Sequence, residues 1–84
     1  MSRTHNLKIK YELAQLHFQE KKDWEIRFND RDFRTGDTII FSVIEFGFMY
    51  TCTIVNIFGD TQYGLQDGYV ILSVKNIMSN LKNQ

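Results

Sequence analysis

Residues 38–58 read TIIFSVIEFGFMYTCTIVNIF, and this stretch decides the fold class. It holds two runs of β-branched and aromatic residues, 38–46 and 48–58, which are separated by Gly47 alone. Such a composition favours strands, and a glycine between two strand-like runs is typical of a hairpin turn. The stretch therefore predicts a β-hairpin whose first strand is buried on much of both faces.

Shorter segments on both sides of this stretch complete a mainly β pattern. Three of them alternate or are rich in β-branched residues, as strands are: residues 7–9, 24–28 and 69–75. Residues 11–21 instead space apolar side chains at helical intervals and end in two lysines, which suit a helix C-terminus. Residues 29–37 and 59–68 are polar or rich in glycine and predict loops.

These elements predict an α+β, mainly β fold, namely a small β-barrel of about five strands with one main helix. A ferredoxin-like sandwich would need a second long helix, which the pattern does not contain. All 84 residues are expected to form a single domain, with a core at residues 5–75 and a polar tail at residues 76–84. Ile77, Met78 and Leu81 are the apolar anchors of that tail.

The composition excludes several classes of protein. Hydrophobic residues make up 43% of the chain and ten basic residues balance ten acidic ones, which is unlike a disordered chain. The same balance argues against a protein that coats nucleic acid through bulk charge. A single cysteine excludes an internal disulfide framework and a cysteine-rich zinc site. Without a signal peptide or an apolar run of about 18 residues, the protein is expected to be soluble and cytoplasmic, with no membrane partner.

The charges gather in the first part of the chain, and most densely in residues 21–36, KKDWEIRFNDRDFRTG. On a strand, Glu25 and Arg27 would share one face about 6–7 Å apart, and Lys22 would lean over them from the helix end. Three polar residues follow at the rim: Asn29, Asp30 and Arg31. This set of donors, acceptors and both charges predicts a binding site. The alternative is a surface ladder of Glu–Arg salt bridges, which contribute little to stability.

The remaining candidate residues give weaker indications of a functional site. His5 and His17 are the only histidines, and no further ligands at metal-site spacing accompany them, so no metal is expected. His5 is a candidate for a site near Lys8, whereas His17 is expected to be a partly exposed helix residue. Cys52 is expected to be a small buried residue. The aromatic run at residues 46–50 is expected to pack in the core and the hairpin, with an exposed stacking platform as the alternative.

Five motifs follow one another in a specific order: His5-Asn6-Leu7-Lys8, Lys22-x-x-Glu25-x-Arg27, Asn29-Asp30-Arg31-Asp32-Phe33, Gly36-Asp37 and Gly68-Tyr69-Val70-Ile71-Leu72. Together they cover roughly residues 5–75 and closely resemble the DUF3850 family, in the ASCH group of the PUA-like superfamily. The resemblance implies a β-barrel of the PUA type with an adjacent helix. It also implies a cleft beside the Lys-x-x-Glu-x-Arg segment, proposed to bind RNA or a modified nucleobase.

Three positions depart from what this resemblance implies. ASCH domains usually carry glycine two residues before the motif lysine, where this chain has Glu20, whose side chain is expected to narrow the cleft or weaken phosphate binding. Relatives that resemble amidohydrolases acting on acylated cytidine use a lysine, a threonine and a glutamate. Lys22 matches that lysine, but Glu25 stands at the threonine position, so the nucleophile is missing. Thr51-Cys52-Thr53 replaces a Thr-Gly-Arg-like step, and the missing basic residue is expected to lower RNA affinity.

The main functional expectation is an RNA- or nucleotide-binding module that uses no cofactor. Its binding residues would be His5, Lys8, Lys22, Glu25, Arg27, Asn29, Asp30 and Arg31. In this interpretation Lys22 and Arg31 meet phosphate, while Arg27 and Glu25 read or orient a base edge.

Two alternatives come from other classes. One is a small hydrolase acting on a modified nucleoside, in which Lys22 is the activated group and Glu25 the acid/base. The other is a protein-interaction module of phage or mobile-element origin, whose protein partner would contact exposed aromatic residues near positions 46–50.

Overall fold

The structure is a computed structural model, and it describes residues 2–76. Its elements follow the predicted order: β1 (Thr4–Ile9), α1 (Tyr11–Phe18), β2 (Trp24–Phe28), β3 (Thr38–Val43), β4 (Met49–Phe58), the 3-10 helix η1 (Thr61–Tyr63) and β5 (Tyr69–Asn76). Asn76, expected to begin the tail, ends β5 instead, and the rest of the predicted tail lies outside the described residues.

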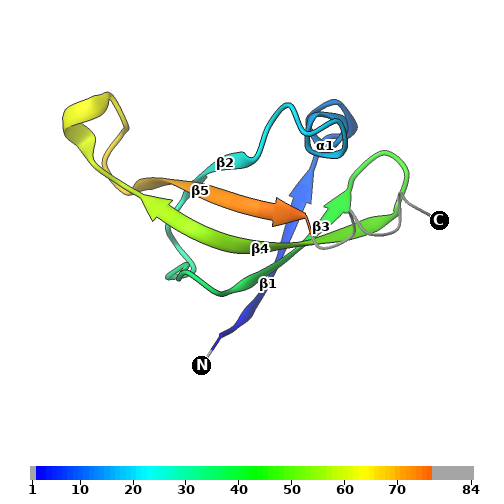
Figure 1. Cartoon of the computed structure of the whole chain (residues 1–84), viewed down its shortest axis with the longest axis horizontal. Coiled ribbons are helices and arrows are strands. Elements are labelled where there is room, and N and C mark those ends of the chain that lie inside the picture. The colour runs from blue at the N-terminus through cyan, green and yellow to red at the C-terminus, as the bar shows by residue number, and fades with distance from the viewer. Residues whose placement is uncertain (1, 77–84) are drawn as a thin grey trace.

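The five strands form one sheet in the order β1-β3-β4-β5-β2. β1 pairs with β3 in parallel, and the three other pairings are antiparallel. The sheet curls into a half-barrel, and α1 lies beside it near the ends of β2 and β3 (Figure 1). The predicted mainly β fold with five strands and one helix is therefore confirmed. No helix within residues 2–76 is long and apolar enough to span a membrane.

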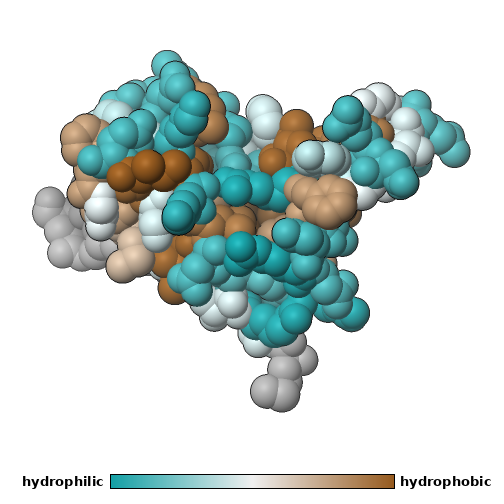
Figure 2. Space-filling model, turned by 180° about the vertical axis from the view of Figure 1, so that it is seen from behind, coloured by the Kyte–Doolittle hydropathy of each residue, from teal (hydrophilic) through white to brown (hydrophobic). Residues whose placement is uncertain are grey.

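The predicted hairpin is β3 and β4, but its first strand ends at Val43 rather than at residue 46. Gly47 takes a φ of +74° and donates its N–H to the Val43 carbonyl, which closes a wide turn. Glu45 in this turn accepts a hydrogen bond from the backbone N–H of Tyr11 at 2.9 Å, at the start of α1. The turn thus leaves the strand path and caps the helix. It lies at the left of Figure 2, where hydrophobic atoms reach the surface.

Helix α1 also ends earlier than predicted, at Phe18 instead of residue 21. The Lys21 N–H bonds to the Leu16 carbonyl at 2.9 Å, and the Glu20 N–H bonds to the His17 carbonyl at 3.1 Å. Glu20 takes a φ of +60°, so the three features together form a Schellman motif. This motif reverses the chain direction and brings the next residue, Lys22, back against the sheet.

The inward faces of the strands build the core. It includes residues from every strand except β2: Leu7, Ile9, Ile39, Phe41, Val43, Tyr50, Cys52, Ile54, Val70, Leu72 and Val74. Cys52 is fully buried, as predicted. His17, predicted to be partly exposed, is buried instead, because its ring packs between α1 and the sheet against Phe41 and Tyr50.

Strand β2 turns its charged side inward and its apolar side outward. Glu25 is only 3% exposed, whereas Trp24, Ile26 and Phe28 are 41%, 47% and 53% exposed. Arg27 shares the inward side with Glu25, as the alternation predicts. Most sheets do the opposite, with apolar residues facing the core and polar residues facing water. This inversion sets up both the site and the surface described below.

Candidate functional site

Glu25 is the centre of a buried ion cluster inside the half-barrel. Its Oε1 accepts a hydrogen bond from the Lys22 ammonium, which the turn after α1 brings back over the strand. Its Oε2 accepts two bonds from the Arg27 guanidinium, from Nε at 3.2 Å and from the terminal Nη2 at 3.0 Å. Lys22 is 9% exposed and Glu25 3%, so the cluster is shielded from bulk water. The surface-ladder alternative for Glu25 and Arg27 is therefore wrong.

His17 and Tyr50 extend this cluster. The Tyr50 hydroxyl lies 2.6 Å from His17 Nδ1, and His17 Nε2 lies 3.4 Å from Glu25 Oε1 and 3.5 Å from the Trp24 carbonyl oxygen. Because Nε2 faces acceptors, the network assigns the proton of a neutral His17 to Nε2, and the Tyr50 hydroxyl then donates to Nδ1. The result is a continuous buried chain of hydrogen bonds from Tyr50 through His17 to Glu25.

The cluster fixes the protonation states of three groups. Burial raises the pKa of Glu25, but the hydrogen bonds from His17 and Lys22 outweigh it and lower that pKa to about 2. Burial raises the pKa of the Tyr50 hydroxyl, and burial with the nearby Glu25 charge raises the pKa of Cys52 to about 12. At neutral pH the site therefore holds an ionised carboxylate, while the phenol and the thiol keep their protons.

Two recesses border the cluster on different sides. Lys22 and His17 line one of about 450 Å³, between the end of α1, the middle of β4 and the end of β5. Arg27 lines the other, of about 180 Å³, together with Arg31. Glu25 lies between the two and binds a cation from each side. The three motif residues thus form one cluster that faces two openings rather than a single pocket.

The second recess lies along the seam between β1 and β2, the two edge strands of the sheet. Arg27 Nη2 donates to the Lys8 carbonyl at 3.0 Å, and Arg31 Nη1 donates to the Asn6 carbonyl at 2.9 Å. Two arginine side chains thus bind the β1 edge where strand pairing is absent. This use of Arg27 and Arg31 positions both guanidinium groups at the mouth of the recess.

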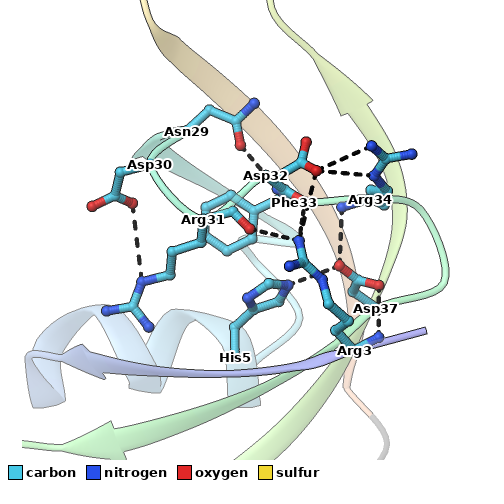
Figure 3. Close-up of polar contacts among 9 residues, drawn as sticks. All are labelled: Arg3, His5, Asn29, Asp30, Arg31, Asp32, Phe33, Arg34 and Asp37. Atoms are coloured by element: carbon cyan, nitrogen blue, oxygen red, sulfur yellow. Dashed lines mark hydrogen bonds and ion pairs between the residues drawn. The ribbon is translucent and has the colours of Figure 1, made fainter. Parts of the chain in front are cut away.

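A separate buried pair anchors the loop between β2 and β3 (Figure 3). Asp37 is 1% exposed and accepts hydrogen bonds from His5 Nε2 at 2.8 Å, the Arg3 N–H at 3.0 Å and the Arg34 N–H at 3.1 Å. The bond from His5 is the main reason that the pKa of Asp37 falls to about 2. The His5 ring also packs edge-on against Phe33, with ring centroids 4.7 Å apart.

Further contacts in Figure 3 hold the same loop in shape. Asn29 Oδ1 accepts a bond from the Phe33 N–H at 2.9 Å. Arg3 Nη2 donates to the carbonyls of Arg31 and Asp32, at 2.7 and 2.6 Å. These contacts give the His5 and Asn29 side chains a structural role, because they fix the path of the loop that carries Arg31.

The predicted site residues therefore fall into three sets, which are the buried cluster, the seam recess and the loop anchor. Lys22, Glu25 and Arg27 form the buried cluster, and Arg31 joins Arg27 at the seam recess. His5 and Asn29 belong to the loop anchor. Lys8 contributes its carbonyl, and its exposed side chain is on the opposite face of β1 from buried His5. Asp30 lines the seam recess and lies 4.0 Å from Arg31.

Sequence reasoning missed His17, Tyr50 and Asp37 as members of these polar clusters. His17 follows Ala14 by three residues on one helix side, and both are buried, so their spacing was the available signal. Tyr50 lies opposite Phe41 on the inward face of the hairpin, whereas Phe46 and Phe48 are exposed. Among the described residues, no group of three or more His, Cys, Asp or Glu is placed to hold a metal ion.

Comparisons with known proteins relate this chain to one family and one fold. The family model described as "Domain of unknown function (DUF3850)" matches residues 4–74. No curated protein matches the sequence. The crystal structure of hypothetical protein PH0355 has a similar fold, with a TM-score of 0.66 and 18% identity over 88% of this chain and 99% of that one. At this identity the likeness concerns the fold alone.

Proposed function

We propose, since the chain belongs to the DUF3850 family, that it is an RNA- or nucleotide-binding module of the ASCH, PUA-like type. Binding would use the Lys22–Glu25–Arg27 cluster and the two recesses that border it. The observation that carries this proposal is the inversion of β2, which holds Glu25 and two cations inside a small half-barrel.

The inward orientation of the charged side of β2 is hard to explain by a gain in the stability of the fold. Taking an ion pair out of water costs desolvation energy, and well-packed apolar residues often replace buried pairs at no loss of stability. Strand β2 carries three large apolar side chains that face outward instead. Charged groups held beside a recess, one with a strongly shifted pKa, are typical of ligand sites.

The chemistry of the two recesses suits a short nucleic-acid ligand. The larger recess, about 450 Å³, is within the size range of small-molecule sites. Lys22 borders it and would meet a phosphate, as would Arg31 at the seam. Arg27 lines the seam recess and would pair with a base edge through its guanidinium, which the buried Glu25 carboxylate orients. Phe28 and Phe33 line the seam recess, and the exposed Phe28 offers a ring for stacking.

Fluorescence anisotropy with labelled short RNA and mononucleotides at several salt concentrations tests this function. Arg31→Ala is expected to weaken binding by about fivefold to tenfold, because it removes one charge-assisted phosphate contact. Arg34→Ala is the matched control, since Arg34 is an exposed arginine of the same loop that pairs with Asp32 outside both recesses.

The salt dependence is a second readout of the same experiment. Two phosphate contacts on a single strand predict a slope of about −1.4 for log K against log salt. If the folded wild type bound no RNA or nucleotide, or if Arg34→Ala weakened binding as much as Arg31→Ala, the proposal would be wrong.

A further inference from the structure

The outward side of β2, β5 and the end of β4 carries a continuous apolar surface, which shares only Phe28 with the lining of the proposed binding site. We call it the outer face, and its members are Trp24, Ile26, Phe28, Phe58, Tyr63, Tyr69 and Ile71. All of them except Ile71 are at least 36% exposed, and Tyr63 reaches 75%. The β2 members of this surface face outward because the charged side of β2 faces inward.

Strand register shows that these side chains are neighbours. Ile26 lies opposite Ile71, which in turn lies opposite Phe58, so one row crosses all three strands. Phe28 lies opposite Tyr69 in the next row, with ring centroids 5.3 Å apart. The Phe58 ring then contacts Tyr63 at 5.8 Å. The outer face is therefore one patch rather than a set of scattered residues.

The size of this patch points to an interface. From the exposed fractions of its side chains, it presents on the order of 600 Å². The largest apolar patch on a typical monomer is about 300–600 Å² and is often functional. A stable interface buries about 800 Å² on each partner, so the patch with a modest polar rim reaches that size.

Charged residues lie at both ends of the outer face: Lys75 and the exposed Asp23 near Trp24, and two acidic residues at the other end. Lys75 of β5 faces outward beyond the Trp24 end, where Trp24 is opposite Ser73. Asp60 and Asp67 flank the other end, in the loop that runs from Phe58 to Tyr69. A twofold axis through the patch would place Lys75 of each copy near the acidic end of the other. The outer face is thus complementary to itself in an antiparallel arrangement.

We propose that the outer face binds a second copy of this chain and forms a twofold-symmetric dimer. Trp24, Ile26 and Phe28 would lie at its centre, where aromatic anchors carry most of the binding energy. The acidic loop disfavours RNA as the occupant, because outward-facing β2 has no basic residue and Asp60 and Asp67 would repel phosphate.

The dimer would also touch the ligand cluster through one residue. The Lys22 ammonium lies 4.9 Å from the centroid of the Trp24 ring, a cation–π contact between the buried cluster and the outer face. Packing a second copy on Trp24 would hold this ring, and with it Lys22, in place. The proposed dimer does not depend on the binding function, however, since it rests on the outward side chains alone.

Sedimentation equilibrium, from low micromolar to several hundred micromolar protein and without nucleic acid, tests the proposal. The wild type is expected to reach twice its 10.0 kDa mass. Trp24 is the only tryptophan, so its emission should shift to the blue over the same concentration range. Ile26→Lys is expected to weaken the dimer at least about tenfold. Ile26→Thr keeps a β-branched residue and should weaken it less, with the fold unchanged by circular dichroism.

Charge reversal separates a second copy from any other occupant. Lys75→Asp should weaken the dimer, and adding Asp67→Lys should restore it. Phe46→Ser is the matched control, because Phe46 is an exposed aromatic residue of the distant β3–β4 turn. A wild type that stays at 10.0 kDa throughout, or a dimer lost in Phe46→Ser but kept in Ile26→Lys, would overturn the proposal. Weaker binding of single-stranded RNA by Ile26→Thr than by the wild type, with the protein still monomeric, would overturn it in favour of a nucleic-acid surface.

Discussion

At the scale of single residues, backbone conformation gives Glu20 a structural role that its charge does not indicate. Glu20 stands two residues before Lys22, and its φ of +60° is the left-handed conformation that glycine adopts without strain. A Schellman motif needs such a residue after the helix. Glu20 also borders the larger recess, so the expected effect of its carboxylate on phosphate binding stays a prediction.

Two substitutions at this position separate the backbone from the side chain. Glu20→Gly and Glu20→Val both remove the carboxylate, so they lose the same side-chain contacts. Only valine is strained at positive φ, because its branched Cβ is crowded there. Chemical denaturation should therefore find Glu20→Gly more stable than Glu20→Val by about 1–2 kcal/mol. Equal stability of the two variants would show that the turn does not hold this conformation.

At the scale of elements, the sequence predicts β2 more fully than any other strand, yet leaves its orientation open. The alternation at residues 24–28 gives the observed bounds, and it correctly groups Glu25 with Arg27. A period of two identifies two faces but does not say which of them faces the core. Partners outside the strand decide that here: Lys22 from the turn after α1, and the Lys8 carbonyl from β1. Burial of His17 depends on the same assembly and was missed for the same reason.

The turn that leads into β5 offers a test of how β2 is held. A Cβ added at Gly68 would lie 2.6 Å from the Phe28 ring, whereas one at Gly64 would meet nothing within 4 Å. Both glycines have positive φ, +87° and +91°, so an alanine suffers similar backbone strain at each. Thermal unfolding should find Gly68→Ala less stable than Gly64→Ala by about 0.5–1.5 kcal/mol, the cost of turning the exposed Phe28 ring out of its rotamer. If the two variants unfolded at the same temperature, Phe28 would not pack on this turn.

At the scale of the whole molecule, a net charge of zero conceals buried charges that act locally. Folding lowers the pKa of Glu25 from 4.5 to about 2 and that of Asp37 from 3.8 to about 2. Both carboxylates therefore stabilise the fold at neutral pH, and this contribution is lost as the pH falls from about 4.5 to about 2. Urea unfolding across this range should show a steep loss of stability that Glu25→Gln reduces. A flat profile would mean that neither carboxylate is held as described.

The central claim is that β2 points Glu25 into the molecule between two cations. Carboxyl-carbon NMR of the folded protein, with the Glu25 signal assigned by its absence in Glu25→Gln, measures this directly. The signal is expected to titrate with a pKa of about 2, because Lys22, Arg27 and His17 surround the carboxylate. It should also shift when a nucleotide is added at neutral pH. A pKa near the ordinary value of 4.5, with no response to ligand, would contradict both the inward orientation of β2 and the site built on it.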